Sequence, residues 1–246
     1  RTMSEEMLAV FIGSSIRLAM PLALAATGEL VSERAGVLNM SVEGMMLIGA
    51  FGGAIGAWAT GSPMLGLAIG VLAVLPVALL QAWLSITLRA NQIVTGIGIN
   101  ILVLGGTTIA YREILGRHSR TEIPGLDKWA PPGLGDIAVF GDAVFRQTWL
   151  LYAGLILIAV VAWVLRDTAI GLAVRAVGAE PRAVDKSGLS VTKVRYGAVL
   201  FTGVMSALAG CFLSIGDIHT FTEGMTNGAG YLALAAEFPE RCRVVP

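Results

Sequence analysis

One long stretch without charge constrains this sequence most: no Asp, Glu, Lys, Arg or His lies between Gly44 and Leu88. A helix that crosses the ~30 Å hydrocarbon layer of a membrane needs about 20 mostly apolar residues. The stretch is too long for one such helix, and the Thr-Gly-Ser-Pro sequence at 60–63 is typical of a turn. It therefore predicts two successive membrane helices, over 44–59 and 64–88.

Further apolar runs repeat this pattern along the chain. Hydrophobic residues make up 55% of the sequence and charged residues 14%, against about 25% charged residues in ordinary globular domains. Core helices of a large soluble protein are a poor alternative, because the chain has too few polar faces to cover them. We predict an all-α, polytopic membrane helix bundle with about six membrane segments. The other segments are 90–111, 147–165, 196–216 and, interrupted only by Arg17, 7–28.

The distribution of Lys and Arg between the loops predicts the orientation. The segment 166–195 carries six basic and three acidic residues, which places it in the cytoplasm. Alternation then places the long connection 112–146 outside the membrane, as an ordered cap or short re-entrant helix, and the turn at Arg89 inside. If 7–28 crosses completely, the N-terminus also lies outside.

Polar residues inside the apolar runs are candidates for the path of a polar solute. Gln92, Thr95 and Asn100 lie in the run 90–111, and burying such groups in hydrocarbon without partners costs several kcal/mol. They either line a wet path or make interhelical hydrogen bonds that only stabilise the bundle. Asn39 and Glu43 are further path candidates.

The segment 28–44, which contains Asn39 and Glu43, interrupts the apolar pattern with charges. It is either a charged loop at the membrane surface or a discontinuous helix that approaches the pore, where free N–H groups meet a polar ligand. Ser41 or Asn39 is suited to cap the helix that follows.

A short cytoplasmic helix is predicted between Pro181 and Gly188. Pro is favoured at the first position of a helix and Gly just after the last, and the two residues bracket about two turns. Such a mixed-charge helix is either a docking element for a cytoplasmic partner or a solvated loop helix.

Several kinds of chemistry find no support in the residues. Lys plus Arg equal Asp plus Glu at 17 each, so nothing suggests a nucleic-acid partner. Two cysteines form neither a disulfide framework nor a four-ligand metal site, and His118 and His219 stand alone. No GxxxxGK[ST] motif occurs, so no P-loop binds ATP. We expect no catalytic residue, metal or cofactor in this chain.

Three motifs make the chain recognisable. The segments 28–50, 175–188 and 221–236 together resemble the ABC transporter permease family that serves nucleosides, simple sugars and branched-chain amino acids. The likeness is closest to the nucleoside and simple-sugar permeases, and it is collinear from about Met7 to Ala236. It implies a transmembrane permease domain over 1–236.

The resemblance implies the membrane-spanning subunit of an importer in a bacterial plasma (inner) membrane. Two permease subunits, identical or siblings, form the translocation path for a nucleoside or simple sugar, or alternatively a branched-chain amino acid. Cytoplasmic ATPase subunits bind ATP and Mg²⁺, and an extracytoplasmic binding protein delivers the substrate. The family's coupling helix, which contacts the ATPase, matches 178–188. The candidate contacts are Gly178, Glu180, Pro181, Arg182, Asp185 and Gly188.

Two features depart from the family. Ala229 stands where a larger basic residue is usual, and 237–246 is an atypical tail without a helical period. The tail leads us to expect a truncated or frame-altered chain that lacks the last helices. A non-functional fragment is therefore one alternative, and a secondary transporter or channel that works alone is another.

Overall fold

The computed structural model describes residues 3–114, 123–129 and 147–241, and these are almost entirely helical. Six helices are long and apolar enough to cross a membrane, which confirms the predicted all-α bundle. The helices are α1 (Met3–Arg34), α2 (Val42–Thr60), α3 (Pro63–Ala82), α4 (Gln92–Ile114), α5 (Trp149–Asp167), α6 (Ala169–Ala179), α7 (Pro181–Lys186), α8 (Val191–Cys211) and α9 (Ala229–Arg241), with π-helical extensions of α3 over Trp83–Thr87 and of α8 over Phe212–Ile218.

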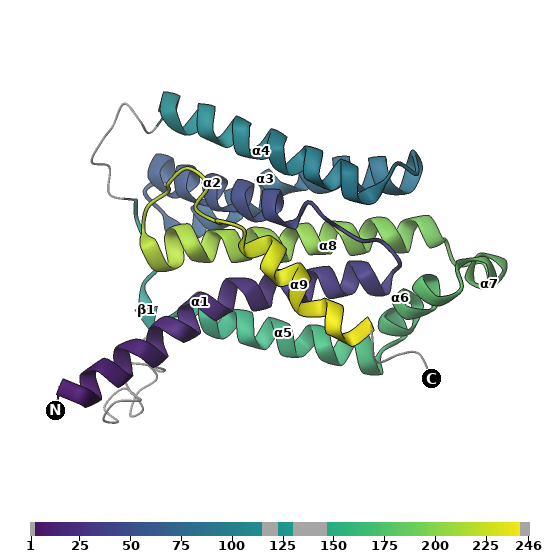
Figure 1. Cartoon of the computed structure of the whole chain (residues 1–246), viewed down its shortest axis with the longest axis horizontal. Helices are drawn as coiled ribbons and strands as arrows, with labels where there is room; N and C mark the ends of the chain where they lie inside the picture. The colour runs from purple at the N-terminus through teal and green to yellow at the C-terminus, as the bar shows by residue number, and fades with distance from the viewer. Residues whose placement is uncertain (1–2, 115–122, 130–146, 242–246) are drawn as a thin grey trace.

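α2 and the span that contains α8 form the centre of the bundle. In each, 72% of the most apolar stretch is buried, against 22–28% for the spans on α1, α3, α4 and α5. Figure 1 shows α4 and α5 on opposite sides of this central pair. The outer helices expose many large apolar side chains, as expected for surfaces that face lipid.

Small residues let the central helices approach closely. A Cβ built on Gly66 of α3 would lie 2.7 Å from the Cβ of Ala57 on α2, and one on Gly49 of α2 would lie 2.5 Å from the Cα of Ala207 on α8. Close packing of this kind, and not a hydrophobic force, drives helix association in lipid. Gly49 and Gly66 therefore serve helix packing.

The two ends of the bundle carry different structures. α6 and α7 lie at one end, which the sequence predicts to be cytoplasmic, and the N-terminus lies at the other (Figure 1). At that other end, β1 (Lys128–Trp129) pairs antiparallel with β2 (Gln147–Thr148). Most of the predicted extracytoplasmic cap over 112–146 lies outside the described residues.

Two helices begin inside the bundle and not at its ends. α2 and α9 each start part-way along it. The segment before α2 enters from the end that carries α6 and α7, and the segment before α9 enters from the opposite end (Figure 1). α9 continues to Arg241, into the tail in which the sequence shows no helical period. The two internal helix starts position the candidate site.

Candidate functional site

The first break in the bundle follows Arg34, where α1 ends in a left-handed turn. Gly36 has φ +79°; its N–H donates to the Glu33 carbonyl (2.9 Å) and the Val37 N–H donates to the Ser32 carbonyl (3.0 Å). This is a Schellman motif, in which glycine adopts the left-handed conformation at little steric cost. The turn directs 37–41 back into the bundle. The structure thus supports the discontinuous helix and not a surface loop.

Side chains satisfy the backbone of this returning segment. The Leu38 N–H donates to Gln92 Oε1 and the Asn39 N–H to Glu29 Oε1, both at 2.8 Å. Asn39 Oδ1 accepts from the N–H and the hydroxyl of Ser41. Glu29, Asn39 and Ser41 are fully buried, so these bonds replace the water that buried backbone groups otherwise need.

Asn100 of α4 joins three segments through one amide group. Its Oδ1 accepts from the Gly44 N–H in the first turn of α2 (2.8 Å). Its Nδ2 donates to the Met40 carbonyl and to the Tyr231 hydroxyl on α9, each at 2.8 Å. The amide therefore connects α4 to the starts of both α2 and α9.

Glu43 accepts three hydrogen bonds at the start of α9. Its Oε1 accepts from the Thr226 hydroxyl (2.6 Å) and the Gly228 N–H (2.9 Å), and its Oε2 accepts from the Gly230 N–H (2.7 Å). A carboxylate at a helix N-terminus pairs with free N–H groups and with the positive end of the helix dipole. The second internal helix start is thus completed by a residue of α2.

The segment before α9 is fixed at its outer end. The ring of Phe221 is buried and lies 5.2 Å from that of Phe51, centroid to centroid. Glu223 receives two hydrogen bonds from the Arg112 guanidinium, at 2.8 and 3.1 Å. This hydrogen-bonded pair lowers the pKa of the exposed Glu223 carboxyl.

Four of the five predicted path residues lie in this cluster, which we call the polar cluster. Asn39 and Gln92 bond the segment 37–41 before α2. Glu43 bonds the start of α9, and Asn100 bonds the starts of both helices. Thr95 does not join these four residues, because its hydroxyl donates to the carbonyl of Asn91, the residue before α4 (3.0 Å). Glu29, Thr226 and Tyr231 also belong to the cluster and were not predicted, although all three lie in the family motifs. Ala229, the departure from the family, is the first residue of α9.

The predicted cytoplasmic segment 166–195 contains two short helices, α6 and α7, where one was expected. α7 starts at Pro181 and ends at Lys186, and Gly188 follows with φ +87°, as the Pro and Gly positions predict. Glu180, Arg182, Asp185 and Gly188 are exposed, and Pro181 is half-buried. α6 was not predicted; the Thr168 hydroxyl caps it by accepting from the Gly171 N–H.

The end of α6 packs against the end of α1. A Cβ on Gly178 would lie 2.1 Å from the Arg34 carbonyl oxygen, so only glycine fits this contact. Arg195 Nε also donates to the Ala35 carbonyl (3.2 Å). Gly178 therefore contacts the same turn that directs the chain into the polar cluster.

Comparison with known proteins decides the family. The family described as "Branched-chain amino acid transport system / permease component" matches residues 11–238. The chain belongs to this permease family. It is accordingly a multi-pass protein of the plasma (inner) membrane and the permease subunit of an ABC transporter.

Three curated relatives are named as sugar or nucleoside permeases. The guanosine ABC transporter permease protein NupQ of Bacillus subtilis is 36% identical, over 94% of this chain and 75% of its own length. A protein of Haloferax volcanii, named provisionally as a glucose ABC transporter permease (TsgC13), is 36% identical over 91% of this chain and 68% of its own. The nucleoside permease NupC of Lactococcus lactis is 31% identical, over 93% and 74%. A comparison with solved structures found no match.

Proposed function

We propose that this permease forms, with a second permease subunit, the translocation path of an importer for a nucleoside or a simple sugar. The names of the relatives support this substrate class. The observation that carries it is the occupation of both internal helix starts: Asn100 bonds the first turn of α2, and Glu43 bonds the start of α9. Internal helix N-termini are where transporters bind substrate carboxylates. With these two filled, a neutral solute fits better than an amino acid.

The five path candidates act in this proposal through the shape of the path. Asn39, Gln92 and Asn100 fix the returning segment, and Glu43 fixes α9, so their polar groups are engaged with the protein backbone. Thr95 lies between Gln92 and Asn100 on α4. We propose that a substrate passes beside this cluster and meets a rigid, polar wall.

ATP cleavage belongs to partner subunits in this proposal, and this chain has no catalytic site of its own. Cytoplasmic ATPase subunits bind ATP and Mg²⁺, and an extracytoplasmic binding protein delivers the substrate. We propose that exposed Glu180, Arg182 and Asp185, with Pro181 and Gly188 at the ends of α7, contact the ATPase. Gly178 lies against the Arg34 carbonyl. A movement of α6 and α7 is therefore transmitted directly to the turn at Gly36, which precedes the polar cluster.

Competition for uptake tests the substrate class. The chain is assembled in proteoliposomes with its ATPase and binding protein, and uptake of a labelled nucleoside and a labelled sugar is measured. We expect one of the two to be taken up with ATP, and an excess of unlabelled leucine to leave that uptake unchanged. Uptake of leucine, or its inhibition of the labelled solute, would contradict the proposal.

A further inference from the structure

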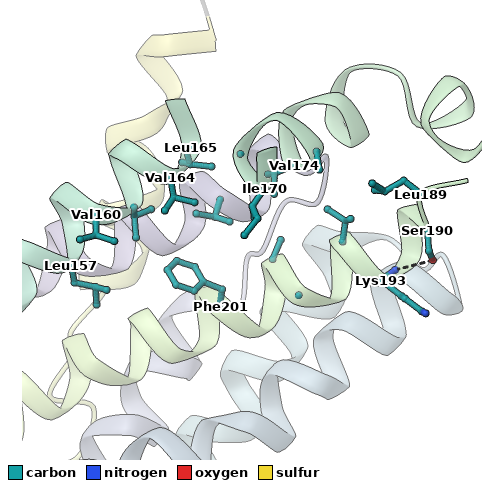
Figure 2. Close-up of a pocket in the computed structure, with 17 residues that line it drawn as sticks. Leu157, Val160, Val164, Leu165, Ile170, Val174, Leu189, Ser190, Lys193 and Phe201 are labelled. Atoms are coloured by element: carbon teal, nitrogen blue, oxygen red, sulfur yellow. Dashed lines mark hydrogen bonds between the residues drawn. The ribbon is translucent and has the colours of Figure 1, made fainter. Parts of the chain in front are cut away.

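An apolar groove of about 630 Å³ lies between α5, α6 and α8, with Val31 of α1 among its lining residues. Figure 2 shows Leu157, Val160, Val164 and Phe201 at the end of the groove that lies away from Lys193 and Ser190. This volume is in the range of sites that bind small molecules. None of its lining residues belongs to the polar cluster, so the groove is separate from that cluster.

The groove spans one leaflet of the membrane. Its lining on α8 runs from Phe201 to Lys193, and eight residues of helix correspond to about 12 Å. Half of the hydrocarbon layer measures about 15 Å. Because α6 lines the groove and lies with α7 at one end of the bundle, the groove occupies the leaflet on that side.

Polar character is confined to the mouth of the groove. Lys193 and Ser190 line the mouth, whereas every other lining residue is apolar or glycine. The Ser190 hydroxyl accepts from the Lys193 N–H (3.4 Å), and within the described residues the Lys193 ammonium has no ion-pair partner. Its charge is therefore exposed at the depth where lipid headgroups lie.

A second cation lies beside the rim. Arg175 Nε donates to the carbonyl of Gly171, a lining residue, at 3.4 Å, and its Nη2 donates to the Arg166 carbonyl at 3.3 Å. These bonds keep the guanidinium at the membrane surface, near Arg166 itself. Asp167 is the acidic residue beside this pair. Basic pockets between membrane helices on the cytoplasmic side bind anionic headgroups.

We propose that this groove binds one anionic phospholipid of the cytoplasmic leaflet, with an acyl chain between α5 and α8 and the phosphate beside Lys193. The match of an apolar shaft with a cationic mouth carries the proposal. A neutral lipid would leave the charge at the mouth without a counterpart. If a protein segment filled the groove instead, the groove would have no room for an acyl chain.

Native mass spectrometry of the purified chain tests the proposal with phosphatidylglycerol and phosphatidylcholine of the same acyl chains. We expect the wild type to prefer phosphatidylglycerol, and Lys193→Gln to reduce that preference by about fivefold, the effect of one cation near a membrane surface. The matched control is Lys186→Gln, which removes an exposed Lys of α7 outside the groove. It should leave the preference unchanged.

A second variant closes the shaft without changing charge. Gly197 lines the groove, and a Cβ there would meet nothing within 4 Å. Gly197→Trp should therefore remove bound phosphatidylglycerol while the helical circular dichroism stays that of the wild type. No lipid preference in the wild type, equal effects of the two Lys variants, or full lipid binding by Gly197→Trp would each overturn the proposal.

Discussion

Asn100 shows how one side chain can determine the position of three helices. Its amide makes three hydrogen bonds, to Gly44, Met40 and Tyr231, which are 56, 60 and 131 residues away in the sequence. Asn has both a donor and an acceptor group, and this site needs both. Neither Asp nor Leu reproduces that combination.

Replacing Glu43 should destabilise the bundle more than replacing a single partner. Glu43→Ala leaves three donors at the start of α9 without an acceptor, and we expect a loss of about 2–4 kcal/mol of unfolding free energy. Thr226→Val removes one of the three bonds and should cost about 1 kcal/mol. Unfolding of the purified variants in detergent measures both values. Equal stability of Glu43→Ala and the wild type would contradict the role given to this carboxylate.

The Arg112–Glu223 pair predicts that the stability of the fold depends on pH. Because the pKa of Glu223 is below its usual value of 4.5 in the folded chain, the pair stabilises the fold above that value. The contribution is lost as the pH falls through the lowered pKa. Glu223→Gln should unfold slightly more easily than the wild type at pH 7 and equally easily near pH 2. A difference that persists at pH 2 would show that the effect does not come from the carboxylate charge.

At the scale of the helix, the sequence predicts the membrane spans well and the breaks between them poorly. The span predicted over 64–88 corresponds to α3 and its extension, 63–87, because transfer into hydrocarbon depends on local composition. α1 instead extends beyond Gly28 to Arg34, because buried Glu29 accepts the Asn39 N–H. That bond depends on the tertiary fold, and so does the meeting of Asn100 with Tyr231. Gln92 and Asn100 are predictable as candidates because polar residues are rare in membrane helices.

Two glycines of α4 give a matched test of how that helix packs. A Cβ on Gly96 would lie 2.5 Å from the Cβ of Met40, whereas one on Gly98 would meet nothing within 4 Å. Gly96→Ala should therefore cost about 1–3 kcal/mol through overpacking. Gly98→Ala should be neutral or stabilise by up to about 1 kcal/mol, since Ala favours helix. Thermal unfolding of both variants compares them, and equal effects would argue against the contact between α4 and the returning segment.

At the scale of the whole molecule, a direct contact joins the end of the bundle that carries α6 and α7 to the polar cluster. α6 touches the end of α1 at Gly178, and the chain then passes directly to residues bonded by Gln92, Glu29 and Asn100. In the function proposed above, transport depends on subunits outside this chain. The assembly, and not the isolated chain, is therefore the unit to test.

The double variant Glu180→Ala with Arg182→Ala should weaken association with the ATPase and leave delivery by the binding protein intact. Both side chains are exposed at α7, so their loss removes polar contacts without disturbing packing. Copurification of the ATPase measures the effect. Arg112→Ala with Glu223→Ala, an exposed charged pair at the opposite end, is the matched control. Unchanged copurification and transport-linked ATP hydrolysis in the α7 variant would contradict the assignment.

The most direct test of the central claim is the energy source of uptake in proteoliposomes. We predict that the chain, assembled with its ATPase and binding protein, takes up a nucleoside or sugar only when ATP is supplied. Uptake should not respond to an imposed ion gradient. Uptake that follows an ion gradient and persists without the ATPase would contradict the account, because the chain would then be a transporter that works alone.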